Sequence, residues 1–271
     1  DGGVYGGWVE NISIKNSQIL GTSNFREIDG LVLENNDMTS NGENMGLLLN
    51  SIRDFTVKNN DIHDAVEDLV RITGESYNGV FENNMVHDLQ GRGALHTDLF
   101  QVFALNGFTP RDITIRGNVF YDDPATGTRP SQGLFIAGPQ GEGYKNLLIE
   151  NNLIAAPLFN SLYISGGQEN VVVRNNTLIP TASDGGGIVR LAARGQYDNS
   201  GVVLENNVFK QLRDETGASN VRDNHIYGNG NADSLFQLSD KPGSSWQDFL
   251  PKDGSAVDFG SNLGALGRLQ Q

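Results

Sequence analysis

The sequence contains no cysteine, which excludes disulfide bridges and thiolate metal sites. It also has no apolar run approaching the roughly 18 residues that a membrane helix needs, so we expect no membrane span. The opening stretch DGGVYGGW lacks a charged and then apolar signal segment, and we expect a mature or trimmed form.

Basic residues are few for the length of the chain. The 271 residues include 19 Lys and Arg against 33 Asp and Glu, a formal net charge of -14. Such a charge argues against nucleic acid as a partner, because the phosphates would be repelled. By the same reasoning an acidic polysaccharide would need a local basic surface or a bridging cation such as Ca²⁺. The length fits one large domain or two small ones.

What the sequence has in abundance is an internal repeat. Short period-2 segments each end in a pair of small polar residues: ISIKNS, LVLENN, FTVKNN, VFENN, ITIRGN, LLIENN, VVVRNN, VVLENN and NVRDN. The second residue of each pair is Ser17, Asn36, Asn60, Asn84, Asn118, Asn152, Asn176, Asn207 and Asn224. One strand, an asparagine-marked bend and a further apolar residue form a rung that cannot bury its own face, so the rungs must stack. Asparagine suits the bend because it tolerates a left-handed backbone, and stacked asparagines form an amide ladder.

This repeat resembles the right-handed parallel β-helix of the pectate-lyase-like superfamily. The resemblance implies an all-β, single-stranded parallel β-helix of about nine rungs with an asparagine ladder. We expect one domain over 1–271, with rungs over about 9–240 and a capping tail over 241–271. In that tail we expect Trp246 and Phe249 to cover the open edge of the last rung.

The residue before each bend supports the stacking independently. Its charge alternates in sign at every rung: Lys15, Glu34, Lys58, Glu82, Arg116, Glu150, Arg174, Glu205 and Arg222. Parallel strands lie about 4.8 Å apart, where opposite charges attract. We therefore interpret these basic residues as structural and not catalytic.

A second strand follows each bend after a loop, as in EDLVRI, TDLFQV, QGLFIA and NSLYIS. Aligning these segments predicts one column of Gly46, Asp68, Asp98, Gly133, Ser161 and Gly187, and another of Leu49, Arg71, Gln101, Ile136, Ile164 and Arg190. Two adjacent columns are both apolar, so periodicity alone does not decide which columns face outward. A bend within the strand would turn both inward.

The segment HTDLFQ stands out because it breaks the repeat beside the longest loops, 87–97 and 121–132. It supplies His96, Asp98 and Gln101 as candidate catalytic residues, and Arg71 on the preceding rung is the fourth. A neutral imidazole can remove a proton, and a neighbouring carboxylate would fix its tautomer. The motif HxDxxQ resembles one in β-helix proteins that act on carbohydrates. The alternative is that Asp98 caps a turn while His96 packs at the start of the strand.

Candidate substrate-binding residues are Glu67, Asp68, Arg190, Tyr163 and Arg129. Arginine suits bidentate binding of a uronate carboxylate. Stacked Asp68 and Asp98 suggest a carboxylate pair for glycosidic acid–base chemistry or a calcium site. Tyr163 is a candidate acid, but the apolar column assigned to it favours core packing.

A competing cluster follows the bends in IHD, VHD and FYD, which stack His63, His87 and Tyr121, with Asp64 over Asp88 over Asp122. Such a set could bind a divalent metal. The alternative is an ordinary β-helix turn in which each Asp accepts local hydrogen bonds. Our assignment is no metal ligand, with Ca²⁺ left open as a cofactor.

Together these features favour a carbohydrate-active enzyme, first a lyase that cleaves an alginate- or pectate-like polysaccharide by β-elimination. A locally basic groove through Arg71, Arg92, Arg111 and Arg129 would offset the acidic surface. The alternatives are a glycoside hydrolase using Asp68 and Asp98, a C5-epimerase, and a non-catalytic glycan-binding β-helix. EDLVRITG, at 67–74, is similar to the NGxExxRxG rung of alginate lyase and chondroitinase B relatives, but lacks its leading Asn-Gly. The resemblance further implies a secreted or periplasmic bacterial protein, and we expect a monomer.

Overall fold

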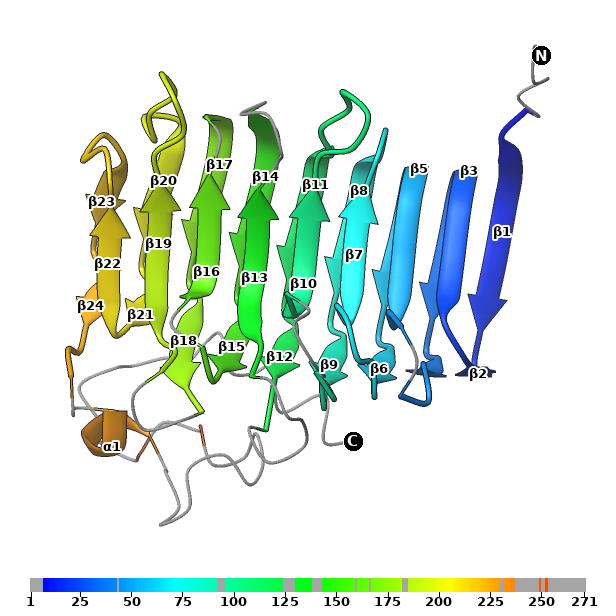
Figure 1. Ribbon diagram of the computed structural model, residues 1–271, viewed down its shortest axis with the longest axis horizontal. Coiled ribbons are helices and arrows are strands. Elements are labelled where there is room, and N and C mark those ends of the chain that lie inside the picture. Colours follow the sequence, from blue (N-terminus) through cyan, green and yellow to red (C-terminus); the bar gives the residue numbers. More distant parts are fainter. Residues whose placement is uncertain are drawn as a thin grey trace.

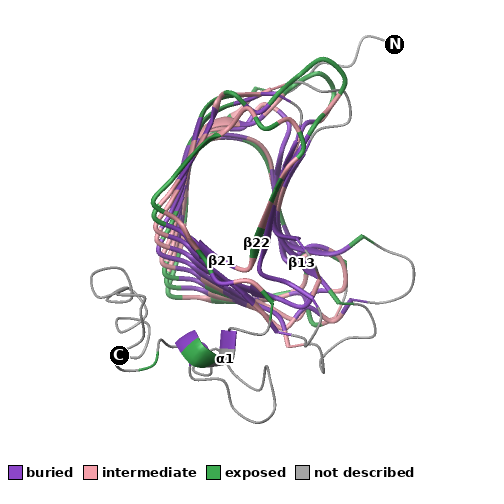
Figure 2. Ribbon diagram, turned by 90° about the vertical axis from the view of Figure 1, so that its left-hand side faces the viewer, coloured by how far each residue is buried: buried purple, intermediate pink, exposed green. Residues whose placement is uncertain are grey.

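A computed structural model describes residues 7–42, 44–91, 96–123, 130–137, 143–158, 160–165, 167–181, 185–229, 232–236, 249 and 252. Within these ranges the chain winds as a coil of parallel strands, seen from the side in Figure 1 and end-on in Figure 2. Every pairing between its named strands is parallel, from β1 with β3 to β21 with β24. The expected all-β parallel β-helix is therefore confirmed.

The coil has three faces. The first face contains β7 (Val70–Thr73), β10 (Asp98–Phe103), β13 (Gln132–Ala137), β16 (Asn160–Ser165), β19 (Ile188–Ala192) and β22 (Gln211–Asp214). The second face contains β8 (Tyr77–Glu82), β11 (Arg111–Arg116), β14 (Tyr144–Glu150), β17 (Gln168–Arg174), β20 (Val202–Glu205) and β23 (Asn220–Arg222). Two long strands, β3 (Ser23–Glu34) and β5 (Leu47–Lys58), run through both faces, and β1 (Val9–Lys15) pairs with β3.

The third face is a separate nine-stranded sheet. It contains β2 (Gln18–Leu20), β4 (Asp37–Thr39), β6 (Asp61–His63), β9 (Met85–His87), β12 (Val119–Tyr121), β15 (Leu153–Ala156), β18 (Thr177–Pro180), β21 (Val208–Phe209) and β24 (His225–Ile226). Its strand number matches the expected count of nine rungs. A short helix, α1 (Ala232–Leu235), lies beneath this face in Figures 1 and 2.

The paired polar residues divide two tasks between them. The first of each pair takes the left-handed backbone, as at Asn35 (φ 55°) and Asn59 (φ 55°). The second forms the ladder: Asn84 donates its side-chain amide to Asn118 Oδ1 at 3.1 Å, and Asn118 donates to Asn152 Oδ1 at 2.9 Å. These amides are buried, so the ladder satisfies polar groups inside the coil.

The alternating charge column is confirmed by the strand register and by ion pairs. Glu34 joins Lys15 at 2.9 Å and Lys58 at 3.0 Å, and Arg116 meets Glu82 at 2.6 Å. Further along, Arg174 pairs with Glu150 at 2.7 Å, and Arg222 pairs with Glu205. Ion pairs between neighbouring rungs thus stabilise the stacking of the second face.

The tail expectation needs a correction at Phe249. This side chain is buried and packs against Tyr121 of β12, with ring centroids 6.0 Å apart, and not over the last rung. The outward positions of the later third-face strands β12, β15, β18 and β21 are largely apolar, and they form a second core with Phe236 and Phe249. An exposed apolar surface of this kind is unfavourable, so Phe236 and Phe249 cover the third face. Trp246 lies outside the described residues.

Candidate functional site

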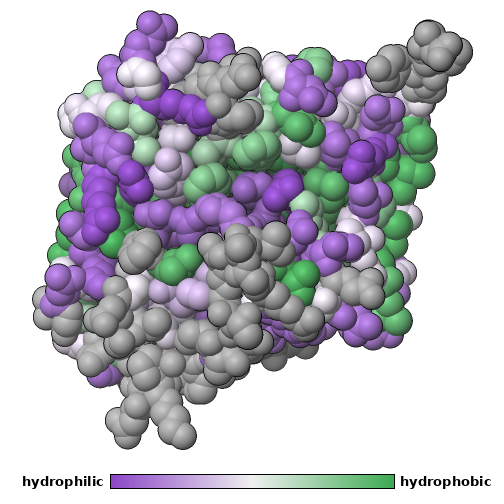
Figure 3. Space-filling view, in the orientation of Figure 1, coloured by the Kyte–Doolittle hydropathy of each residue, from purple (hydrophilic) through white to green (hydrophobic). Residues whose placement is uncertain are grey.

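The outer side of the first face carries one column that passes through most of the predicted site. The register aligns Leu48, Arg71, Gln101, Phe135, Tyr163, Arg190 and Arg213 on successive rungs. Figure 3 shows this side of the molecule, where hydrophilic residues gather in a band across the middle. We call this set the outward column.

Two successive inward residues explain why positions three apart share one side of a strand. Leu99 and Phe100 are both fully buried in the main core, as are Leu69 and Val70 one rung earlier. A regular strand alternates its side chains, but two inward residues in a row return the next side chain to the outer surface. Gln101 therefore lies on the same side as Asp98, three residues earlier.

This geometry corrects the predicted columns. Asp98 pairs with Gln132 and not with Gly133, and Gln101 pairs with Phe135 and not with Ile136. Gly133 instead occupies a crowded inward position, where a Cβ would lie 2.2 Å from the carbonyl oxygen of Ser161. Leu49, Ile136 and Ile164 likewise belong to the core.

His96 is the exposed member of a polar network. Its side chain is 52% exposed, whereas Asp98 is fully buried, and His96 Nδ1 lies 3.1 Å from Asp98 Oδ2. The same carboxylate oxygen accepts a hydrogen bond from Gln101 Nε2 at 3.0 Å. A buried carboxylate on Nδ1 orients the ring and places Nε2 as the proton-accepting nitrogen. Three of the four candidate catalytic residues, His96, Asp98 and Gln101, thus meet in one network.

Two residues that the sequence reasoning missed complete the network. Gln132 Nε2 lies 2.8 Å from His96 Nε2, and Asn160 donates to Gln132 Oε1 at 2.5 Å. The bond from Asn160 fixes the Gln132 amide so that its NH₂ group faces the imidazole. The only signal for either residue was its place in a segment aligned one position out of register.

Asp68 and Asp98 form a buried acidic pair next to Arg71. Asp68 Oδ2 accepts hydrogen bonds from Arg71, with Nε at 2.9 Å, and Asp68 Oδ1 accepts from the backbone N–H of Asp98 at 3.0 Å. Burial raises the pKa of Asp68, and the neighbouring Asp98 carboxylate raises it further against the opposing effect of Arg71. Burial also raises the pKa of Asp98, although His96 counteracts it. Arg71 is therefore the ion-pair partner of Asp68.

An aromatic pair continues the outward column beyond His96. The Phe135 and Tyr163 rings stack with centroids 4.6 Å apart and planes 5° from parallel, and His96 meets the edge of Phe135 at 4.8 Å. The expectation that Tyr163 packs in the core is wrong, because its true register neighbours are Phe135 and Arg190 and its side chain is only half-buried. Arg190 lies 5.5 Å from the Tyr163 ring and pairs with Glu215 at 2.6 Å.

The other predicted site residues lie apart from this network or outside the described ranges. Glu67 is half-buried in the turn before β7, where its backbone N–H donates to the carbonyl of Asn44 at 3.1 Å. Arg129 and Arg92 lie outside the described residues. Arg111 does not line the first face beside Arg71, since it belongs to β11 on the second face.

No protein-family model matches the sequence, and no curated protein matches it either. Among solved structures, the chain is similar to the Azotobacter vinelandii mannuronan C-5 epimerase AlgE4 A-module. The identity is 15% and the TM-score 0.43, over 81% of this chain and 61% of that one. The likeness is one of fold, and this chain spans less than two thirds of that module.

The His63–His87 stack on the third face does not have the form of a metal site. The two rings stack at 5.2 Å, as the predicted alignment required. His63 lies between Asp37 and Asp64, and His87 between Asp61 and Asp88, each nitrogen 2.7 to 2.9 Å from a carboxylate. Hydrogen bonds at both ring nitrogens leave no lone pair for a metal. Across the described residues, no group of three or more His, Asp or Glu side chains could hold a metal ion.

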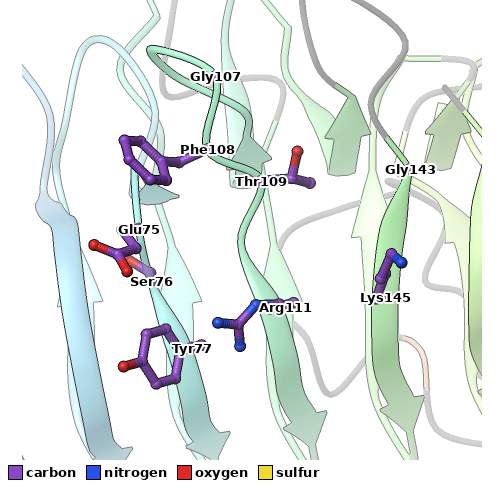
Figure 4. A pocket seen from close by; sticks show the side chains of 9 residues that line it. All are labelled: Glu75, Ser76, Tyr77, Gly107, Phe108, Thr109, Arg111, Gly143 and Lys145. Atoms are coloured by element: carbon purple, nitrogen blue, oxygen red, sulfur yellow. The ribbon is translucent and has the colours of Figure 1, made fainter.

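A pocket of about 470 Å³ lies away from His96, at the start of the second face (Figure 4). Its lining residues include Tyr77, Phe108, Arg111 and Lys145. None of them belongs to the outward column, so the pocket and the His96 network are separate features. No helix in the described part of the chain is long and apolar enough to span a membrane.

Proposed function

We propose that this protein is a carbohydrate-active enzyme that removes the C5 proton of a uronic acid residue in a polysaccharide, with His96 as the base. The observation that supports it most is the half-exposed imidazole of His96 held at Nδ1 by the buried carboxylate of Asp98. A base so oriented presents Nε2 outward, and general-base catalysis of this kind contributes roughly 10²- to 10⁴-fold in rate. In this state Gln132 contacts Nε2, so a bound sugar would replace that hydrogen bond.

The neighbouring residues fit a uronate substrate. Asp68 engages Nε and one terminal nitrogen of Arg71, and the other N–H groups of the guanidinium remain for a sugar carboxylate. Neutralising that carboxylate stabilises the charge that develops when C5 loses its proton. The stacked Phe135 and Tyr163 rings provide apolar contact area beside His96 for an adjacent sugar ring.

Among the possible outcomes of proton removal we propose β-elimination, with cleavage of the chain as in a polysaccharide lyase. The C5-epimerase alternative shares the first step and differs only in returning a proton to the opposite side of C5. The hydrolase alternative is weaker. Asp68 and Asp98 are fully buried and hydrogen-bonded to their neighbours, so neither carboxylate reaches a glycosidic oxygen.

The test is an assay on alginate, pectate and other uronate polymers, with and without calcium, of the wild type and the His96→Ala variant. A lyase yields unsaturated, ultraviolet-absorbing ends, which the variant should lose by about 10²-fold or more. An epimerase run in D₂O yields deuterium at C5 without shortening the polymer. Reducing ends without ultraviolet absorbance, retained in His96→Ala, would contradict the proposal.

A further inference from the structure

The second face has its own column of outward-facing residues, which we call the second-face column. Its charges do not alternate in sign as those of the ladder from Lys15 to Arg222 do. The register places Glu10, Asp29, Arg53, Tyr77, Arg111, Lys145 and Glu169 on successive rungs. Arg111 and Lys145 are direct partners on β11 and β14, the strands that also pair Arg116 with Glu150. Like charges in register are unfavourable, so the same two strands hold one register pair of opposite charges and one of like charges. In a chain of net charge -14 such a cluster of cations needs a reason.

Aromatic side chains adjoin these cations. The guanidinium of Arg111 lies 4.3 Å from the Tyr77 ring centroid, and that of Arg53 lies 5.4 Å from the same ring. Arg53 also lies 3.6 Å from the ring of Trp8. These cation–π contacts hold Tyr77 in place.

Phe108 adds a second aromatic wall. It is 49% exposed on a turn closed by two backbone hydrogen bonds with Leu105, at 2.9 and 3.0 Å. Figure 4 shows Phe108 above Tyr77 and Arg111, with Lys145 on the next strand. Together these four residues line the pocket of about 470 Å³, which is enough for a sugar residue.

The acidic partners of the cations stand to the side and not between them. Arg111 pairs with its sequence neighbour Asp112 at 2.7 Å, and Lys145 pairs at 2.6 Å with Glu169, itself 68% exposed. Glu75, which also lines the pocket, is paired with Arg53. Exposed ion pairs contribute about 1 kcal/mol or less, so a ligand anion can compete with them.

We propose that this pocket is a second saccharide-binding site, which holds an acidic sugar residue with its carboxylate between Arg111 and Lys145 and its ring face against Phe108, next to Tyr77. The choice of an acidic sugar rests on the proposed function. The site lies on the second face, outside the His96 network, so it retains the polymer without taking part in proton removal. Attachment at two points raises the effective affinity for long chains over short ones.

The test is titration calorimetry with oligogalacturonate and oligomannuronate on the wild type, the Arg111→Gln/Lys145→Gln variant and a control, Lys15→Gln/Lys58→Gln. The control removes two cations from the same face, but from the alternating ladder. We expect the Arg111/Lys145 variant to lose one class of binding site, with affinity about tenfold or more weaker, and the control to keep it. Phe108→Ala, on an exposed turn, should weaken the same site without changing the charge. Equal isotherms for wild type, the Arg111/Lys145 variant and Phe108→Ala would overturn the proposal.

Turnover of short oligosaccharides separates this proposal from the proposed function. If only the pocket proposal is wrong, turnover still depends on His96, and the Arg111→Gln/Lys145→Gln variant binds oligosaccharides as the wild type does. If the catalytic proposal fails alone, no turnover occurs, yet the Arg111-dependent binding persists.

Discussion

Raising the pH should weaken the fold through the stacked histidines of the third face. Burial by itself would lower the pKa of His87, but hydrogen bonds from the imidazolium to Asp61 and Asp88 outweigh it and raise the pKa to about 9. The pKa of His63 is also raised, because its bonds to Asp37 and Asp64 outweigh burial. The folded protein therefore holds these protons more tightly than the unfolded chain, whose histidines titrate near 6.5.

The linkage sets both the sign and the size of the effect. A raised folded-state pKa gives stability that is complete below about pH 6.5 and is lost as pH rises toward about 9. For His87 this difference corresponds to roughly 3 kcal/mol as an upper value. The His87 side chain is only 17% exposed, but Asp61 is 52% exposed. Solvent screening at that partner reduces the expectation to roughly 1–3 kcal/mol.

The measurement is urea unfolding followed by circular dichroism between pH 6 and 9, on the wild type and on His87→Gln. Burial raises the pKa values of Asp122 and Asp68 to about 7, so these groups also lower stability as pH rises. The difference between the two proteins removes their contribution and reports on the stacked histidines. We expect the free energy of unfolding of the wild type to exceed that of the variant below pH 6.5, and this difference to close by pH 9. A gap that stays constant over this range, or that widens, would refute the reasoning.

Three further predictions concern the ladder, the core and the outward column. Asn118→Ala should lower the free energy of unfolding by roughly 3–5 kcal/mol, since it breaks buried hydrogen bonds to Asn84, Asn152 and the Phe81 carbonyl. Asn224→Ala, on the half-exposed last rung, should lower it by only about 1 kcal/mol. Urea unfolding of both variants measures the difference. Gly79→Ala would place a Cβ 2.0 Å from the Phe55 ring and should cost at least roughly 2 kcal/mol, much of which Phe55→Leu in the same chain should restore. Tyr163→Ala should raise KM for a uronate polymer several-fold with a smaller effect on kcat, because in our proposal the ring contacts an adjacent sugar and lies outside the His96–Asp98 pair. A loss in kcat alone would contradict that role.

The sequence by itself determined the coil. Each rung pairs with the rungs next to it, so a pattern that repeats along the sequence specifies the stacking. The asparagine ladder and the alternating charges from Lys15 to Arg222 are two such patterns. The same local logic brought His96, Asp98 and Gln101 together, since they belong to one segment, and placed Arg71 on the rung beside them.

Only the tertiary structure decided which side of the first face looks outward. Leu99 and Phe100 both turn into the core, a break in alternation that no period-2 pattern contains, and it moves Tyr163 and Phe135 to the surface. Gln132 and Asn160 joined His96 for the same reason, through a register one residue away from the aligned one. The Arg111 pocket likewise depends on how the turn of Phe108 folds over β8 and β11, because its residues come from separate rungs and share no sequence period.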